Sequence, residues 1–393
     1  MKWVNKGHEY DIVAEKYLND EELFIYGAGD CGKGLYDLLR KLDIKVSFID
    51  GNRQKQLQGC MGEKVISPIE LFEYEKKKNI IIAVTPQYYA EIKTLLEEHG
   101  YKSEEDFWSM EDFCQKQLPI YMAYVKRKLY MNSVGFLSTT VCNLCCEACL
   151  NFTPYNKNPE HMDLNSAKKT LDDYFNAIDF VNLFSYTGGE PLLFPYIDEL
   201  LTYIGDNYNK KIYKLGMSTN CTLIPKDSTC EILRKYNFHV FIDDYSEYVD
   251  ISKKVLPKLM EKLNKFGISY AVNSGKEAYW IDLAPLETDN TGMSEEQLIV
   301  YKTKCNVPFR ELRNSRLYAC NYASFAMKAG LQKDNKNDWY DLSTYTIESQ
   351  KELLEFIMGY NEKGYVDFCK HCAGFLPINP YKKPVGRQIS RNT

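Results

Sequence analysis

The sequence predicts an α/β protein whose parallel sheets are built from alternating strands and helices. Short apolar runs alternate with amphipathic stretches over residues 22–100, and the same alternation returns over residues 134–301. Several runs are apolar without interruption, as in strands that are buried on both faces of a parallel sheet. With 393 residues, the chain has enough length for two or three domains.

The first group of elements predicts a small Rossmann-like module over residues 1–118. Three strands are expected in it, over residues 23–26, 45–50 and 79–85. The first strand leads directly into a glycine-rich turn, and leucines then recur at helical spacing over residues 35–42. This order of strand, turn and helix is typical of a nucleotide-binding βαβ unit.

Gly27, Gly29 and Gly32 form the pattern G-x-G-x-x-G in that turn, and Asp50 follows about twenty residues later. Glycines let the backbone approach a phosphate closely, and a carboxylate can bind a ribose diol. The module is similar to the small Rossmann-like domains of sugar-modifying and polysaccharide-biosynthesis enzymes. Two interpretations are open: a nucleotide site at these four residues, or a degenerate module whose glycines only permit a tight turn.

A second group of elements, over residues 134–301, predicts a barrel of parallel strands. It follows a linker helix that we expect over residues 119–133. Strands are predicted over residues 180–184, 212–217, 239–243 and 268–272. Helices are predicted over residues 196–204, 228–235 and 254–266. Repeated βα units of this length place ligand-binding loops at the carboxyl ends of the strands.

Cys142, Cys146 and Cys149 form the pattern C-x3-C-x2-C near the start of this barrel. Three thiolates can hold one face of a cubane iron–sulfur cluster and leave one iron open, whereas a structural site closes all four positions. Three residues separate Cys145 from Cys149, which would put the motif in reversed order, so we interpret Cys145 as non-ligating. The alternatives are a zinc knuckle and cysteines that only fill a core.

A second motif, Gly188-Gly189-Glu190-Pro191, follows about forty residues later at the end of a predicted strand. The two motifs together resemble those of the radical S-adenosylmethionine (SAM) superfamily. This resemblance implies a partial (β/α)6 barrel, a [4Fe-4S] cluster on the three cysteines, and SAM on the open iron. It also implies that residues 188–191, Ser218 and Asn220 bind SAM, and that reductive cleavage of SAM gives a 5′-deoxyadenosyl radical that abstracts a substrate hydrogen atom.

Four further cysteines lie beyond the barrel, in the expected domain over residues 302–393: Cys305, Cys320, Cys369 and Cys372. The first two bracket a predicted β-hairpin over residues 312–319. Two separated pairs suit one fully ligated cluster or one tetrahedral metal ion. The arrangement resembles the twitch domain, the short form of the SPASM extension, which implies a second [4Fe-4S] cluster. A structural zinc ribbon is the alternative.

Composition limits the class of partner and the compartment. The net charge of −5 argues against nucleic acid as the main partner, because a polyanion requires a basic face. The N-terminus has no apolar core of a secretory signal, and no apolar run is long enough to span a membrane. Thirteen cysteines without an export signal indicate metal or redox chemistry, so we expect a cytoplasmic protein.

These observations lead to three functional hypotheses. The first is a radical SAM enzyme, of oxidoreductase or isomerase type, that epimerises or oxidises a sugar or nucleotide-linked sugar in surface-glycan metabolism, with electrons from a flavodoxin or ferredoxin. The second is a peptide-modifying maturase, and the third is a non-enzymatic iron–sulfur or zinc scaffold. Cys221, which follows the predicted SAM-binding residues, is a candidate hydrogen-atom donor or a core thiol.

Overall fold

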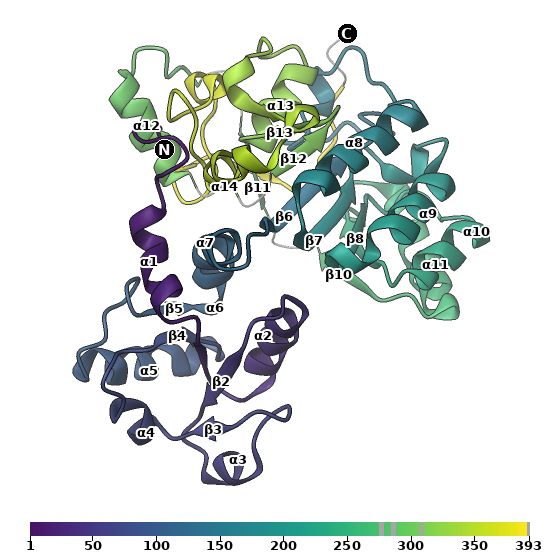
Figure 1. The fold of residues 1–393 in the computed structure, drawn as a ribbon. Helices are drawn as coiled ribbons and strands as arrows, with labels where there is room; N and C mark the ends of the chain where they lie inside the picture. Colours follow the sequence, from purple (N-terminus) through teal and green to yellow (C-terminus); the bar gives the residue numbers. More distant parts are fainter. Residues whose placement is uncertain (275–278, 284–287, 306, 308–309, 391–393) are drawn as a thin grey trace. The chain divides into compact units, whose positions relative to one another are not determined.

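A computed structural model describes residues 1–274, 279–283, 288–305, 307 and 310–390 (Figure 1). The chain forms two compact units, Tyr10–Tyr130 and Met1–Glu9 with Met131–Thr393. The first nine residues group with the second unit because the Met1 amino group donates to the Gly359 carbonyl at 2.7 Å. The segment up to Tyr130, which the sequence assigned to a linker helix, groups with the first unit.

The Tyr10–Tyr130 unit contains a five-stranded sheet, drawn in purple and blue in Figure 1. Its strands are β1 (Leu23–Tyr26), β2 (Val46–Ile49), β3 (Val65–Ile66), β4 (Asn79–Ile82) and β5 (Phe107–Ser109). All pairs are parallel, and the order is β3-β2-β1-β4-β5. The three predicted strands are present, and the sequence missed β3 and β5 because they are only two and three residues long. This is the strand order of a Rossmann half with two further strands.

Helices surround this sheet: α1 (Asp11–Asn19), α2 (Asp30–Lys41), α3 (Arg53–Gln58), α4 (Pro68–Phe72), α5 (Pro86–Glu98), α6 (Met110–Asp112) and α7 (Leu118–Tyr124), with a π-helix over Phe113–Gln117. The strand residues of β1 and β4 are buried, which is the reason that all of them except Asn79 are apolar or aromatic. Side chains such as Phe24, Ile80 and Phe107 form the core between sheet and helices.

The second unit contains an eight-stranded sheet in the order β10-β9-β8-β7-β6-β12-β13-β14. Its strands are β6 (Tyr130–Leu137), β7 (Phe180–Thr187), β8 (Ile212–Thr219), β9 (His239–Asp244), β10 (Tyr270–Ser274), β12 (Arg310–Arg313), β13 (Arg316–Tyr318) and β14 (Trp339–Asp341). Strands β7 to β10 run parallel in sequence order, as the sequence predicted. The sixth parallel strand of this partial barrel is β12, which pairs with the free edge of β6.

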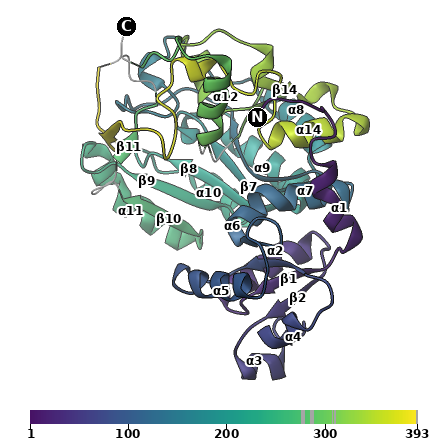
Figure 2. The same ribbon diagram turned by 90° about the vertical axis from the view of Figure 1, so that its left-hand side faces the viewer.

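Four helices connect the parallel strands: α8 (Leu164–Ala177), α9 (Ile197–Tyr208), α10 (Asp227–Lys235) and α11 (Asp250–Phe266). They follow one another along the same side of the sheet (Figures 1 and 2). Helices predicted over residues 196–204, 228–235 and 254–266 are thereby confirmed. Loops at the carboxyl ends of the strands therefore gather at one mouth, where ligands bind in such folds.

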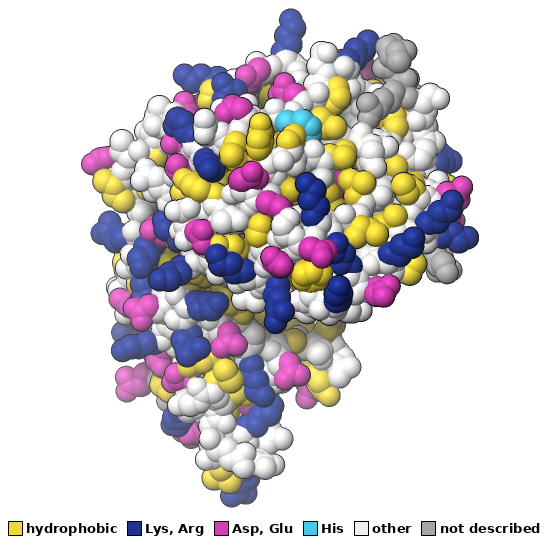
Figure 3. All heavy atoms as spheres, turned by 90° about the vertical axis from the view of Figure 1, so that its right-hand side faces the viewer, with side chains coloured by type: hydrophobic (Ala, Val, Ile, Leu, Met, Phe, Trp, Pro, Cys, Tyr) yellow, Lys and Arg dark blue, Asp and Glu magenta, His cyan; other side chains and the backbone are white. Residues whose placement is uncertain are grey.

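The remainder of this unit adds α12 (Glu295–Lys304), α13 (Asn321–Lys328) and α14 (Gln350–Ile357), and β11 (Tyr279–Ile281) pairs antiparallel with β15 (Lys382–Pro384). The predicted hairpin is confirmed as β12 and β13. On the face shown in Figure 3, acidic and basic side chains are interspersed. Among the described residues, no helix is long and apolar enough to cross a bilayer.

Candidate active site

Two loops at the carboxyl ends of neighbouring strands pack against each other. The loop after β6 carries the cysteine motif, and the loop after β7 carries Gly188 and Gly189. A Cβ at Gly189 would lie 2.2 Å from the carbonyl oxygen of Val141, and a Cβ at Gly188 would lie 2.6 Å from that of Thr139. The Gly189 N–H donates to the Thr139 carbonyl at 2.9 Å. Only glycines therefore allow the two loops to meet.

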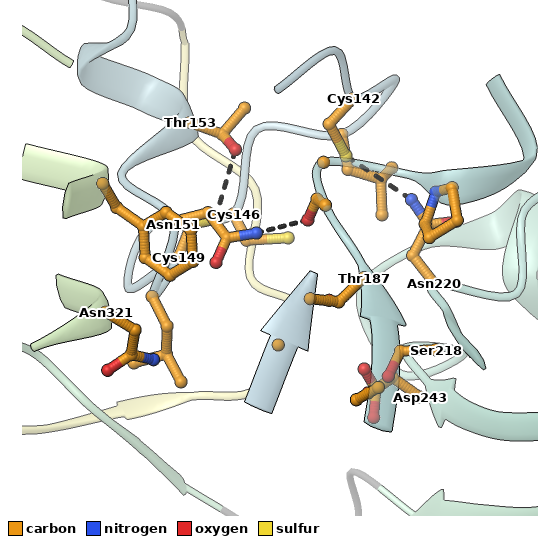
Figure 4. A pocket seen from close by; sticks show the side chains of 18 of the residues that line it. Cys142, Cys146, Cys149, Asn151, Thr153, Thr187, Ser218, Asn220, Asp243 and Asn321 are labelled. Atoms are coloured by element: carbon orange, nitrogen blue, oxygen red, sulfur yellow. Dashed lines mark hydrogen bonds between the residues drawn. The ribbon is translucent and has the colours of Figure 1, made fainter. Parts of the chain in front are cut away.

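A cavity of about 410 Å³ lies between these loops and the ends of the strands (Figure 4). Cys142, Cys146 and Cys149 line it, so the structure brings together the three thiols that the sequence predicted as cluster ligands. Cys145 is not among the lining residues. The predicted SAM-binding residues that share this cavity are Gly188, Gly189, Pro191, Ser218 and Asn220.

Each thiol sulfur has a polar side chain beside it: Asn220 Nδ2 is 3.5 Å from Cys142 Sγ, Gln388 Nε2 is 3.1 Å from Cys146 Sγ, and Thr153 Oγ1 is 3.3 Å from Cys149 Sγ. Figure 4 draws two of these contacts as dashed lines. Hydrogen bonds to sulfur orient thiolate ligands and change the reduction potential of an iron–sulfur cluster. The surroundings of the three cysteines therefore suit ligands and not only core packing.

The donor set fits an iron–sulfur cluster. Burial raises the pKa of Cys142 to about 11 and also raises that of Cys146, so these thiols ionise only when a cationic group binds them. Among the described residues, no three Cys, His, Asp or Glu side chains converge closely enough to hold a single metal ion. A cubane of several atoms holds its ligands farther apart than one ion does. Three thiols on one cavity wall match a cluster with one iron left open to that cavity.

Glu190 has a different position from the one expected of a SAM contact. It is fully buried and is not among the residues that line the cavity. Its Oε1 accepts hydrogen bonds from the Leu192 N–H at 3.1 Å and the Thr219 hydroxyl at 3.0 Å, and its Oε2 accepts from the Asn220 N–H at 2.8 Å. Burial raises its pKa to about 7 in spite of these bonds. Glu190 therefore joins the loop after β7 to the end of β8.

Asn220 connects this network to the cysteine loop. Its Oδ1 accepts from the Thr222 N–H at 3.1 Å, and its Nδ2 donates to Asn143 Oδ1 at 3.1 Å. Cys221 is fully buried and absent from the cavity lining, with a positive φ of 58°. A thiol in that position cannot reach a substrate in the cavity, so we interpret Cys221 as a packing residue.

The barrel also matches a known family. Residues 136–270 match the Radical SAM superfamily. This part of the chain is a radical SAM domain. The match includes both motifs, and it implies a [4Fe-4S] cluster and SAM as cofactors of an enzyme. Residues 19–105 separately match the family described as C2185-like, N-terminal.

Similarity to individual proteins is partial. A region of 87 residues is 38% identical to the uncharacterized protein MJ0907 of Methanocaldococcus jannaschii, and it spans 22% of this chain and 29% of that protein. SuiB of Streptococcus suis is 21% identical over 54% of this chain and 46% of its own, with a TM-score of 0.31. BtrN, solved in complex with AdoMet and 2-DOIA, is 15% identical over 64% of this chain and 97% of its own, with a TM-score of 0.40.

A C-terminal segment, residues 382–389, covers the cysteine loop of the radical SAM domain. Gln388 Oε1 accepts from the Cys145 N–H at 2.7 Å, and the Ile389 N–H donates to the Cys145 carbonyl at 2.9 Å. Glu147 on the loop forms ion pairs with Arg387 and with Lys383, the latter at 3.2 Å. Sequence reasoning missed this segment because its partners lie about 240 residues earlier in the chain.

The four cysteines beyond the radical SAM domain also come together. Cys305, Cys320, Cys369 and Cys372 line one small cavity. Backbone N–H groups point at two of their sulfurs, because the Gly374 N–H donates to Cys372 at 3.3 Å and the N–H after it donates to Cys305 at 3.2 Å. Burial raises the pKa of Cys369 to about 12. Four thiols that line one cavity provide the donor set of one fully ligated cluster, whose ligands lie farther apart than those of a single metal ion.

The three glycines in the glycine-rich turn of the N-terminal unit are constrained in different ways. Gly27 has a φ of 115°, and a Cβ at Gly32 would lie 1.8 Å from the Gly27 carbonyl oxygen. A Cβ at Gly29 would meet no atom within 4 Å, so this position is open. Asp50 accepts from the Ala28 N–H at 2.9 Å and from Lys55 at 2.8 Å. Burial alone would raise the pKa of Asp50, but these hydrogen bonds outweigh burial and lower it.

The wall of the main cavity nearest β12 contains polar side chains that sequence reasoning missed. Arg310 and Glu311 come from β12, and Asn321 begins α13. Figure 4 shows Asn321 on the side of the cavity away from Ser218 and Asn220. No motif marks these residues, because β12 reaches the mouth only through its pairing with β6.

Proposed function

We propose that this protein is a radical SAM enzyme that abstracts a hydrogen atom from a sugar or a nucleotide-linked sugar, and so epimerises or oxidises it. The observation that carries the chemistry is the cavity in which Cys142, Cys146 and Cys149 meet the glycine loop after β7. When bound, the cluster and SAM would supply the organic radical that removes the substrate hydrogen. The residues of the chain would hold both cofactors and the substrate at one mouth of the barrel.

The roles of the individual residues follow from their contacts. The glycine pair would leave its backbone open to SAM, and Ser218 and Asn220 would bind its polar groups from the end of β8. Glu190 would hold these two loops in register without touching SAM. Gln388 and residues beside it would cover the cysteine loop and exclude water from the cluster.

We further propose that Cys305, Cys320, Cys369 and Cys372 hold a second [4Fe-4S] cluster, as in a twitch domain. Their shared cavity and the N–H donors on two sulfurs support this assignment. The N-terminal unit supports a nucleotide-linked substrate, because its strand order and the open space at Gly29 suit a phosphate on the backbone of residues 27–32.

The experiment is anaerobic reconstitution followed by a product screen with nucleotide sugars and short peptides. We expect about eight irons per chain, four for each cluster, and release of 5′-deoxyadenosine with a nucleotide sugar. The variant in which Cys142, Cys146 and Cys149 are all Ala should lose about half of the iron and all SAM cleavage. The matched control is Cys145→Ala, which should keep both. A triple variant that still cleaves SAM would refute the proposal, and a modified peptide would replace the sugar with a peptide substrate.

A further inference from the structure

The guanidinium of Arg310 extends away from the main cavity that this residue lines. Arg310 and Glu311 are consecutive residues of β12, and the side chains of consecutive strand residues point to opposite faces. Glu311 shares its face with Arg313, whose Nε donates to Glu311 Oε1 at 3.1 Å. The Arg310 guanidinium lies instead at the end of α14, where its Nη2 donates to the Ile357 carbonyl at 3.4 Å.

This position is next to the cavity of the four C-terminal cysteines. Strands β12 and β13 pair with Glu311 opposite Tyr318, which places Arg310 and Cys320 at the same end of the hairpin. Cys305 precedes the start of the same strand. Burial lowers the pKa of Arg310, and the charges of the Cys320 and Cys305 thiols raise it. The guanidinium and both thiols are therefore within electrostatic reach of each other.

A second cation lines the four-cysteine cavity itself. Lys302 is in the last turn of α12 and lines this cavity together with the thiols. Burial raises the pKa of Cys369 to about 12, and the charge of Lys302 opposes this rise. Among the described residues, neither Arg310 nor Lys302 forms an ion pair with a carboxylate. Asp367, the carboxylate nearest to Cys369 in the sequence, pairs with Lys363 at 2.8 Å.

Arg310 also has a buried donor without a partner. Its Nε has no hydrogen-bond acceptor among the described residues. Burial of a charged group with an unsatisfied N–H is costly, and buried polar groups in native proteins seldom lack a partner. An anionic group bound between the four thiols would offset this cost by its charge.

The cysteines of the radical SAM domain have different surroundings. Burial raises the pKa of Cys142, and the charges of Cys149 and Glu190 raise it further. The charges that raise the pKa of Cys146 are those of other cysteines. The two cysteine sites therefore differ in the sign of the charges beside them.

We propose that Arg310 and Lys302 set the reduction potential of the second cluster and hold it above that of the first. A cluster with four thiolate ligands is negatively charged, and reduction adds a further negative charge. Nearby cations therefore favour its reduced form. This inference rests on the proposed function, since it requires a [4Fe-4S] cluster on the four C-terminal cysteines.

The test is a redox titration of the reconstituted full-length protein, followed by electron paramagnetic resonance. The variant in which Cys142, Cys146 and Cys149 are all Ala assigns the signal of the second cluster. We expect this cluster to have the higher potential in the protein without SAM. Arg310→Gln should lower this potential by at least about 59 mV, which corresponds to about a tenfold change in the equilibrium of a one-electron couple. Arg310→Lys keeps the charge and should lower it by less, as should Lys302→Gln, because water partly screens this half-buried ammonium.

The control is Arg234→Gln on α10, which removes an exposed charge and should leave both potentials unchanged. Iron content is measured on each sample. About four irons in the wild type would refute the second cluster, and this inference with it, whereas absence of SAM cleavage would refute only the proposed reaction. With about eight irons, a higher potential for the first cluster, or unchanged potentials in both Arg310→Gln and Lys302→Gln, would overturn the inference.

Arg310→Gln could also fail to hold the second cluster. Retention of this cluster in Arg310→Lys would then support the inference, because the charge alone would decide whether the cluster binds. Loss of the cluster in both variants would overturn the role of the charge and assign Arg310 to packing at the end of α14.

Discussion

Two walls of the cavity differ in the hydrogen bonding of their buried polar atoms. The β8-side wall comprises Gly188, Gly189, Ser218, Thr219 and Asn220, and the β12-side wall comprises Arg310, Glu311, Asn321 and Tyr322. On the β8-side wall, Thr219 and Asn220 donate to the buried Glu190, and Asn220 also pairs with Thr222. Among the described residues, the buried polar atoms without a partner include three from the β12-side wall and none from the β8-side wall.

This difference indicates two kinds of binding surface in one cavity. A wall whose polar groups already satisfy each other keeps its shape when empty, so it presents a preorganised backbone to a cofactor that every turnover requires. A wall with unsatisfied groups lacks this support, so its buried polar atoms carry a desolvation cost in the folded protein. The same contrast predicts opposite responses to mutation.

Glu190→Ala should have the largest effect, because it removes the acceptor of three buried donors on the β8-side wall. We expect SAM affinity to fall at least about tenfold and the free energy of unfolding to fall by about 2–3 kcal/mol. Calorimetry with SAM and thermal melting measure the two. The exposed Glu199→Ala on α9 is the matched control. An unchanged SAM affinity would show that the two loops keep their register without Glu190.

Asn220 and Asn321 offer the same substitution on the two walls. Asn220→Ala removes a side chain that pairs with Asn143 and Thr222, and should lower the free energy of unfolding by about 1–3 kcal/mol. Asn321→Ala removes an unpaired buried oxygen, and should change it by less than about 0.5 kcal/mol, or raise it. Chemical denaturation of both apo proteins gives the comparison. Equal losses would contradict the distinction between the walls.

Asp338 provides an unpaired buried atom outside the cavity lining. Burial, and then the nearby charge of Asp367, raise its pKa to about 7, and its Oδ1 has no partner. As pH rises from about 4 to about 7, the unfolded chain loses this proton while the folded protein keeps it, so the free energy of unfolding falls. Asp338→Asn should therefore stabilise the protein by about 1–3 kcal/mol at alkaline pH and by less under mildly acidic conditions. Melting curves at both pH values test this, and an equal gain at both would contradict it.

Gln388→Leu should have a specific effect on the cluster, and the expected change is small. It removes the N–H that points at Cys146 Sγ. Hydrogen bonds to sulfur favour the reduced cluster, so the reduction potential should fall while the iron content stays near that of the wild type. Redox titration followed by electron paramagnetic resonance measures it, with the exposed Gln58→Leu as control. An unchanged potential would leave Gln388 with a purely structural role.

Much of this architecture follows from local sequence. The apolar run over residues 80–82 and the alternation after β7 identified buried parallel strands, because burial on both faces favours apolar residues. Gly188 and Gly189 were recognisable because they match a family motif, and the structure gives the physical reason for the motif, since the close approach of the two loops leaves no room for a Cβ. The sequence did not predict β3 and β5, because strands of two and three residues are too short to show a periodicity.

The features that sequence reasoning missed depend on long-range pairing. Glu190 was expected to contact SAM, yet the β8 residues that bond it turn its carboxylate away from the cavity. Arg310 and Glu311 carry no motif and reach the cavity only because β12 adds to the edge of β6. Gln388 reaches Cys146 across 242 residues. Such positions follow from topology and not from any local pattern.

The covering of the cysteine loop by residues 382–389 has a consequence for biosynthesis. On the ribosome, Cys146 emerges 242 residues before Gln388, so the loop exists for most of translation without the segment that covers it. The loop is then open to iron and sulfide donors, and the last contacts close only after residue 389 has left the ribosome. The order of synthesis thus leaves an interval for loading the cluster, and the tail ends that interval.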